Sequence, residues 1–270
     1  MKIKTYRWGR PKKSLGQHFL VNEVVLQSIQ EVIDPKFDDS FVEIGAGKGA
    51  LTRNLIPRLK HLWAIEIDSD LLPALRLNCG NSSKITICHQ DARTFLLKDL
   101  RGTDGTEKFR ICGNLPYCIA AELILHFGRQ WRYIDDLHFM VQKEVGERIC
   151  AHPRTSTYSR LTLDVGFYLD SEILLHISPD AFSPVPAVDS VLIRLKPRQK
   201  VQRIDKNLFF SLVKIAFSHR RKKVANNLKQ LITSTDLVSL GIDSEARAQD
   251  LALQDYLNLT EFLSDSKREI

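Results

Sequence analysis

Three short stretches carry side chains that together could bind an adenosine-containing ligand. VEIGAGKGA, residues 42–50, follows an apolar run, and its glycines allow a tight turn and a close approach of the backbone to a ligand: Gly45, Gly47 and Gly49. Glu66 ends the next apolar run, where a carboxylate can accept both hydroxyls of a ribose. After the third run, Asp91 can accept a hydrogen from an adenine amino group while the backbone at Ala92 reads the ring edge. Their order favours an adenosine-containing cofactor.

Each of these features has an alternative explanation. The glycine spacing completes neither the GxGxxG dinucleotide fingerprint nor a GxxxxGK[ST] phosphate loop. Glu66 could be a solvated strand-end residue beside Asp68 and Asp70, and Asp91 could cap a helix that begins near residue 92. Their position at the ends of successive strands favours the ligand site, because open α/β sheets bind ligands there.

The stretch NLPY, residues 114–117, ends the fourth apolar run and resembles the [DNS]PP[YFW] motif of enzymes that methylate exocyclic amino groups. The Asn114 amide oxygen and the Leu115 carbonyl could accept both amino hydrogens of an adenine and favour a pyramidal, nucleophilic nitrogen. Pro116 lacks an N–H and stiffens the turn, and Tyr117 offers a face for a flipped base. The alternative is an ordinary turn with an incidental Asn and Tyr.

Apolar runs that alternate with helical patterns predict a mostly parallel sheet covered on both faces, a Rossmann-like α/β fold. The expected strands are SFVEI before the glycine turn and the ranges 62–68, 84–90, 109–115, 136–143 and 188–195. After Pro197 only helical patterns remain, at 206–233 and 243–264. The predicted organisation is therefore a cofactor-binding domain over 1–198 and a small α-helical domain over 199–270.

Composition and charge distribution restrict the class of protein. The chain has 270 residues, 43% hydrophobic, and no apolar run of the length that crosses a membrane. Five cysteines without a CxxC pair or a Cys/His cluster predict reduced thiols and no metal, and the protein is expected in the cytoplasm. The net charge is +7, and the basic residues gather in three regions: the first thirteen residues, Lys196 with Arg198, Lys200 and Arg203, and most densely HRRKK, residues 219–223. Such runs suit phosphates or a solvated basic face.

Seven runs in order along the chain resemble the ribosomal RNA small-subunit adenine dimethyltransferases of the KsgA type: KKSLGQHFL, VEIGAGKGALT, GNLPYCI, VQKEVGERI, YSRL, AFSPVPAVDSVLIRL and AFSHRRKKVANNL. The resemblance implies a methyltransferase that uses S-adenosylmethionine and releases S-adenosylhomocysteine. It also implies dimethylation at N6 of two neighbouring adenosines in the 3′-terminal hairpin of small-subunit rRNA, during subunit maturation. The implied partner is the rRNA or an assembly intermediate of the subunit.

The resemblance assigns roles to individual residues. The implied cofactor-binding residues are His18, Leu20, Gly45, Gly47, Glu66, Asp91, Ala92 and Asn114. The implied catalytic residues are Asn114, Leu115, Pro116, Tyr117 and Phe182, with Phe182 stacking on the target base opposite Tyr117. The expected RNA-binding residues are Lys12, Lys13, Arg220, Arg221, Lys222 and Lys223. The last four would grip rRNA phosphates away from the catalytic pocket.

Three positions depart from the pattern that we associate with the family. Ala46 replaces a common proline and is expected to loosen the glycine turn, His18 stands where asparagine is common, and Cys118 is expected to serve packing only. Two other functions remain open at this point, a resistance-type methyltransferase acting on large-subunit rRNA and an assembly factor that acts chiefly by binding. A monomer is expected, because the basic surfaces are assigned to RNA.

Overall fold

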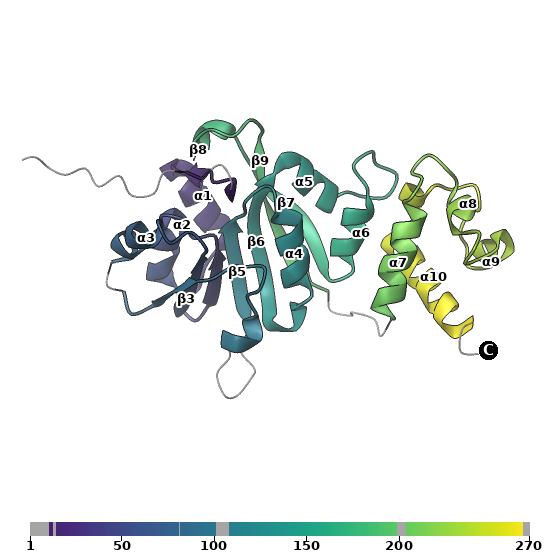
Figure 1. Ribbon diagram of the computed structural model, residues 1–270, viewed down its shortest axis with the longest axis horizontal. Helices are drawn as coiled ribbons and strands as arrows, with labels where there is room; N and C mark the ends of the chain where they lie inside the picture. Colours follow the sequence, from purple (N-terminus) through teal and green to yellow (C-terminus); the bar gives the residue numbers. More distant parts are fainter. Residues whose placement is uncertain (1–10, 13–14, 81, 101–107, 199–203, 267–270) are drawn as a thin grey trace, which may run out of the picture. The chain divides into compact units, whose positions relative to one another are not determined.

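The computed structural model describes residues 11–12, 15–80, 82–100, 108–198 and 204–266 (Figure 1). The chain forms two compact units. The first contains Met1–Gly146 and Ser171–Pro197, and the second contains Glu147–Asp170 and Arg198–Ile270. The sequence predicted a division at residue 198, whereas Glu147–Asp170 groups with the C-terminal helices.

A seven-stranded sheet forms the first unit, in the order β4-β3-β2-β5-β6-β9-β7. Its strands are β2 (Ser40–Ile44), β3 (His61–Glu66), β4 (Ile85–His89), β5 (Phe109–Asn114), β6 (Ile134–Gln142), β7 (Leu169–Ile177) and β9 (Ser190–Pro197). Neighbours from β4 to β6 are parallel, and β9 pairs antiparallel with β6. The predicted α/β class is confirmed, but β7 was missed. Its half-buried, charge-interrupted sequence LDSEILLHI lies at the edge of the sheet.

Helices cover both faces of this sheet. They are α1 (Glu23–Ile33), α2 (Ala50–Leu55), α3 (Leu72–Cys79), α4 (Ala120–Gly128) and α5 (Lys143–Ile149). One core cluster joins α1 and α2 to the sheet face that carries Met140, whereas Phe127 of α4 contacts Phe139 at a ring distance of 6.5 Å. Since successive side chains of a strand point to opposite faces, α4 lies across the sheet from α1 and α2.

A short two-stranded sheet brings the N-terminal segment to the sheet's ligand-binding edge. Strand β1 (Phe19–Leu20) pairs antiparallel with β8 (Phe182–Ser183), and the N–H groups of Val21 and Asn22 donate to Ala181 O. Asn22 then caps α1, because its side chain accepts from the N–H groups of Val24 and Val25. This pairing fixes residues 15–20 beside the ends of β2 and β5.

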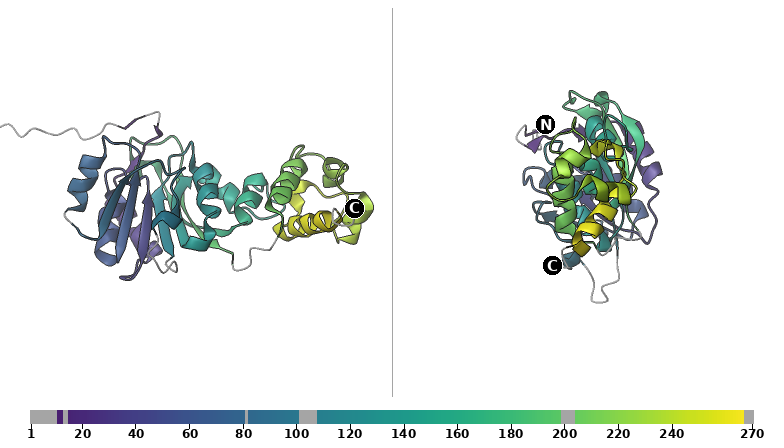
Figure 2. Two further views of the ribbon diagram at one scale, coloured as in Figure 1. Left: turned by 60° about the horizontal axis from the view of Figure 1, so that its bottom comes forward. Right: turned by 90° about the vertical axis from the view of Figure 1, so that its right-hand side faces the viewer.

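The second unit is helical (Figure 2), and aromatic side chains pack together inside it. Its helices are α6 (Arg160–Gly166), α7 (Lys206–Ala216), α8 (Val224–Leu228), α9 (Ser234–Ser239) and α10 (Leu253–Ser266). Phe167, just after α6, lies 4.6 Å from Phe209 of α7, and Tyr158 lies 6.4 Å from Phe217, between ring centroids. These contacts explain why Glu147–Asp170 joins the C-terminal helices.

Short 3-10 helices connect several of these elements: η2 (Ile56–Arg58), η3 (Leu97–Leu100), η4 (Trp131–Tyr133), η5 (Pro179–Ala181) and η6 (Ala248–Asp250). In the described part of the chain, every helix is too short or too polar to traverse a lipid bilayer.

Candidate active site

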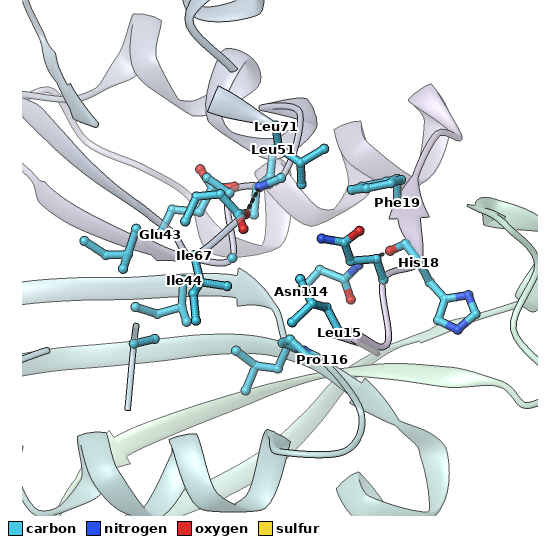
Figure 3. Close-up of a pocket in the computed structure, with 18 of the residues that line it drawn as sticks. Leu15, His18, Phe19, Glu43, Ile44, Leu51, Ile67, Leu71, Asn114 and Pro116 are labelled. Carbon is cyan, nitrogen blue, oxygen red and sulfur yellow. Dashed lines mark hydrogen bonds between the residues drawn. The ribbon is translucent and has the colours of Figure 1, made fainter. Parts of the chain in front are cut away.

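A cavity of about 450 Å³ opens at the carboxyl ends of the parallel strands, within the first unit (Figure 3). Each of four neighbouring strands contributes at its end: Ile44 from β2, Glu66 from β3, Gln90 after β4 and Asn114 from β5. Residues 15–21 close another side. The cavity therefore occupies the edge where the sequence predicted a ligand, and it has the size of a cofactor site.

The glycine turn after β2 is held by hydrogen bonds to the neighbouring strand. Gly45 and Gly47 have φ angles of 69° and 58°, in the left-handed region that glycine adopts at low cost. Gly45 N donates to Ile65 O at 2.9 Å, and Ala46 N donates to the same oxygen at 3.2 Å. A proline at Ala46 could not make the second bond, so this bond counters the loosening expected from the sequence.

Glu66 is buried at the floor of the cavity, with 4% of its surface exposed. One carboxylate oxygen accepts from Gly47 N at 2.7 Å and the other from Asp68 N at 2.8 Å. Burial raises the pKa of Glu66, and the two backbone N–H groups oppose that shift. Because each oxygen keeps a further lone pair, the carboxylate fits the predicted pair of ribose hydroxyls.

Glu43, which the sequence analysis did not single out, also lines the cavity. It lies in β2 with 3% of its surface exposed, and Thr52 Oγ1 of α2 donates to its carboxylate at 2.6 Å. Removal from water raises its pKa to about 8. Its position inside an otherwise apolar strand was the signal that could have identified it.

Asp91 lies in a turn between β4 and η3, so it does not cap a helix that begins near residue 92. Its carboxylate accepts from Arg93 N at 2.9 Å, which closes the local turn, and it also accepts three hydrogen-bond contacts from the Arg93 guanidinium. The Arg93 side chain lowers the pKa of Asp91. Asp91, Ala92 and Arg93 all line the cavity. Recognition of a cofactor adenine by Asp91 and Ala92 stays a prediction.

Asn114 ends β5 with its side-chain amide oriented by the N-terminal segment. Its Nδ2 donates to the backbone oxygen of His18 at 2.7 Å. Because the NH2 group is used in this bond, the amide oxygen remains available as an acceptor. Leu115 is 1% exposed, and its N–H donates to Met140 O on β6 at 3.1 Å, which fixes the turn that follows. Pro116 also lines the cavity.

Tyr117 lines the cavity close to Asn114, and both its hydroxyl and its ring have contacts that hold it in place. Its hydroxyl is 2.7 Å from Ser190 Oγ at the start of β9. The His18 ring stacks on it with a centroid distance of 5.4 Å and an interplanar angle of 22°. Burial raises the pKa of Tyr117, which keeps the hydroxyl protonated. Tyr117 therefore presents a fixed aromatic face.

Two expectations do not fit the observed positions. Phe182 is 2% exposed and packs in the core with Leu20, its register partner in the β1–β8 pair, so it is not among the residues that line the cavity. Its ring is covered in this structure, and its stacking on a target base stays a prediction. Cys118, expected to serve packing only, is exposed at the cavity wall.

Lys12 is paired with two carboxylates in this structure. Its Nζ lies 2.6 Å from Asp68 and 2.8 Å from Asp70, and Gln17 also donates to Asp68 at 3.0 Å. The two aspartates raise the pKa of Lys12. These bonds tie the N-terminal segment to the end of β3, so Lys12 anchors this segment, and its contact with RNA stays a prediction. Lys13 lies outside the described residues.

Two of the four predicted basic residues near α8 have internal partners. The Arg220 guanidinium donates to Ser156 O and to Gln249 Oε1, the latter at 3.0 Å, and Lys223 pairs with Glu245. All four side chains lie at exposed positions, and Arg221 and Lys222 form no ion pair within the described residues. Arg220 and Lys223 therefore also make contacts within the second unit, and phosphate binding by all four residues stays a prediction.

The remaining cavity wall is mostly apolar and escaped sequence reasoning. It includes Phe19, Leu51, Ile67 and Leu71, and Lys48 Nζ lies 4.8 Å from the centre of the Phe19 ring. Phe19 follows the predicted His18 directly, so that adjacency was the available signal. Within the described ranges, His, Cys, Asp and Glu side chains form no group of three or more that could hold a metal ion.

The fold and the cavity define a Rossmann-like methyltransferase, and comparison with known proteins identifies the family. Residues 9–265 match the family Ribosomal RNA adenine dimethylase. The chain is 39% identical over 259 residues to "Ribosomal RNA small subunit methyltransferase A" of Hydrogenovibrio crunogenus, which covers 95% of this chain and 97% of the relative. The chain therefore belongs to the ribosomal RNA adenine dimethylase family, a family that implies S-adenosylmethionine as cofactor.

Solved structures agree with this assignment. A dimethyladenosine transferase from Plasmodium falciparum aligns with a TM-score of 0.78 and 27% identity, over 94% of this chain and 99% of that one. The 23S rRNA methyltransferase ErmE shares the fold, with a TM-score of 0.70 and 24% identity, over 91% of this chain and 99% of that one. The predicted family, fold class and rRNA adenine dimethyltransferase activity are confirmed.

The buried Glu43 generates a prediction about stability and pH. Its folded-state pKa of about 8 exceeds the ordinary value of 4.5, so between these values the folded protein retains a proton that the unfolded chain has lost. Stability therefore falls as pH rises through this window. Glutamine cannot ionise, so the Glu43→Gln protein should lose less unfolding free energy than the wild type between about pH 5.5 and pH 8. The difference between the two losses should exceed about 1 kcal/mol.

Urea denaturation of the two proteins at both pH values measures this difference. The exposed Glu144→Gln variant, which removes a carboxylate at the surface, is the matched control and should follow the wild type. Equal pH dependence for wild type and Glu43→Gln would contradict the assignment of a protonated, buried Glu43.

Proposed function

We propose that this protein dimethylates, at N6, two neighbouring adenosines in the 3′-terminal hairpin of small-subunit rRNA during subunit maturation. The observation that carries the proposal is the orientation of Asn114, whose NH2 group is bound to His18 O at 2.7 Å while its oxygen remains an acceptor at the cavity. An adenine amino group needs such an acceptor, because its nitrogen lone pair is delocalised into the ring and is a poor nucleophile.

The described residues fit S-adenosylmethionine, which when bound supplies a sulfonium methyl group. Glu66 would hold the ribose hydroxyls, Gly45 would lie beneath the methionine part, and Asp91 with Ala92 would read the adenine. The apolar wall at Ile67 and Leu71 suits the flat face of that ring. Other implied cofactor contacts are at His18, Leu20 and Gly47. No resident metal is proposed.

The acceptor base would lie on the other side of Asn114. The Asn114 amide oxygen and the Leu115 carbonyl would accept the two amino hydrogens, which favours a pyramidal nitrogen with its lone pair directed at the methyl group. Pro116 would restrict the turn that carries both acceptors, and Tyr117 would stack on the base. The proton is released after transfer, so catalysis depends on positioning more than on a strong base.

The proposed substrate follows the curated relative, whose name specifies the small subunit at 39% identity over nearly the whole chain. The likeness to the 23S rRNA methyltransferase ErmE is below 25% identity and supports the shared fold alone. We further propose a cytoplasmic monomer that recognises the rRNA or an assembly intermediate of the small subunit. Arg221 and Lys222, both exposed, would bind rRNA phosphates from the second unit.

Methyl transfer to ribosomal subunits tests the proposed function. Wild-type protein should transfer label from S-adenosylmethionine to small subunits that lack the modification, and nucleoside mass analysis should detect N6,N6-dimethyladenosine. Asn114→Ala should lower kcat by about 100-fold or more, since it removes a group that stabilises the transition state. Its affinity for S-adenosylhomocysteine should fall by less than about tenfold.

Asn258→Ala, in helix α10 of the second unit, is the control asparagine substitution and should retain activity. Label in large subunits instead of small ones would contradict the proposed substrate. If cells carrying Asn114→Ala lose the methylation but still assemble small subunits normally, the main biological role would be assigned to binding.

Another prediction concerns Arg221 and Lys222. Arg221→Ala with Lys222→Ala should weaken binding to small subunits and reduce the slope of log K against log salt by about 1 to 2, since each phosphate contact contributes about 0.7 to 0.9. Binding of S-adenosylhomocysteine should not change. The pair Arg129→Ala with Arg132→Ala removes the same charge from exposed positions of the first unit and should preserve the slope. A salt slope unchanged by the Arg221/Lys222 pair would refute the phosphate-binding role.

A further inference from the structure

The backbone and the side chain of His18 make hydrogen bonds to different partners. The backbone oxygen accepts from Asn114 Nδ2 at 2.7 Å, as described above. The ring Nδ1 lies 2.7 Å from Pro184 O. Because a carbonyl oxygen only accepts, Nδ1 must carry the proton and donate it, so this bond fixes the ring's orientation. Figure 3 shows the imidazole pointing away from Glu43, Leu51 and Leu71, the side proposed for the cofactor.

The ring instead contacts the residue that would receive the target base. It lies nearly parallel to Tyr117, with ring centroids 5.4 Å apart and an interplanar angle of 22°. This is an offset stack of the kind that aromatic pairs prefer. The Tyr117 hydroxyl is held at 2.7 Å by Ser190 Oγ. The rings of His18 and Tyr117 therefore form an aromatic shelf. Hydrogen bonds to Pro184 O at one end and to Ser190 Oγ at the other fix this shelf.

Rings at this separation leave no room for a base between them, so a base must stack on the Tyr117 face opposite His18. We propose that His18 is a positioning residue for the acceptor adenine: its imidazole backs Tyr117 and fixes the plane on which the base stacks. This inference rests on the proposed function, and it moves the His18 side chain from cofactor binding to the acceptor side.

The shelf has a consequence for the order of the two methyl transfers to one nitrogen. After the first transfer the base must stay, or return, in a pose that again directs N6 at a donor methyl group. A Tyr117 ring without backing would tilt and release the monomethylated base more often. The ratio of N6-monomethyladenosine to N6,N6-dimethyladenosine therefore reports the rigidity of the shelf more directly than the overall rate.

Two substitutions separate stacking from the hydrogen bond. His18→Asn removes the ring but keeps a donor, and His18→Phe keeps the ring but removes the donor. We expect His18→Asn to raise KM for small subunits about two- to tenfold, the range of an aromatic stack, and to increase the monomethyl product. His18→Phe should restore both quantities to within about twofold of wild type. Both variants should bind S-adenosylhomocysteine within about twofold of wild type, by calorimetry.

The other outcomes are equally decisive. Weaker S-adenosylhomocysteine binding in both variants, with an unchanged KM for subunits, would return the His18 side chain to the cofactor site and overturn the proposal. An equal loss in His18→Asn and His18→Phe would assign the effect to something other than stacking and would also overturn it. An active wild type with an unaffected His18→Asn contradicts only this inference, whereas a wild type inactive on small subunits contradicts the proposed function itself.

Discussion

The site depends on one buried carboxylate that two backbone amides satisfy. Glu66 accepts from Gly47 N at 2.7 Å and Asp68 N at 2.8 Å at the end of β3. Burying a carboxylate is costly unless hydrogen bonds compensate, so the glycine turn and the chain after β3 must keep these positions for Glu66 to remain inside. The carboxylate thereby fixes two walls of the cavity and still has lone pairs for a ligand.

The same constraint extends to the N-terminal segment. Asp68, whose N–H binds Glu66, accepts from Gln17 and Lys12 through its own carboxylate. That segment continues to His18, whose carbonyl orients the Asn114 amide, and into the short β1–β8 pair. A chain of hydrogen bonds thus joins the proposed ribose site to the proposed acceptor site. Removing water from either site would strengthen each of these bonds.

Sequence reasoning succeeded where the order of residues along the chain determines their place in space. Gly45, Glu66 and Asn114 each follow an apolar strand, and parallel strands bring their carboxyl ends to one edge, so local patterns located the cavity correctly. The five expected strands that follow the glycine turn all exist, although β7, at the sheet edge, was missed because charged residues interrupt its sequence.

It did not find the contacts that long-range pairing supplies. Phe182 is covered through its register with Leu20, far away in sequence, and Lys12 is neutralised by aspartates more than fifty residues later. Arg220 is likewise occupied by carbonyls from the segment before α6. A local motif does not reveal these partners, because they come from distant parts of the sequence. A basic run, for example, has the same pattern whether or not it is ion-paired.

The most direct test of the account is the contribution of Glu66 to cofactor binding. Calorimetric titration of S-adenosylhomocysteine into wild-type and Glu66→Gln protein should show binding weakened about 10- to 100-fold in the variant, the range for hydrogen bonds to a charged group. Circular dichroism would verify that the variant is folded, and Glu144→Gln should bind as the wild type does. Equal affinity in a folded Glu66→Gln protein would contradict the claim that this carboxylate organises the site.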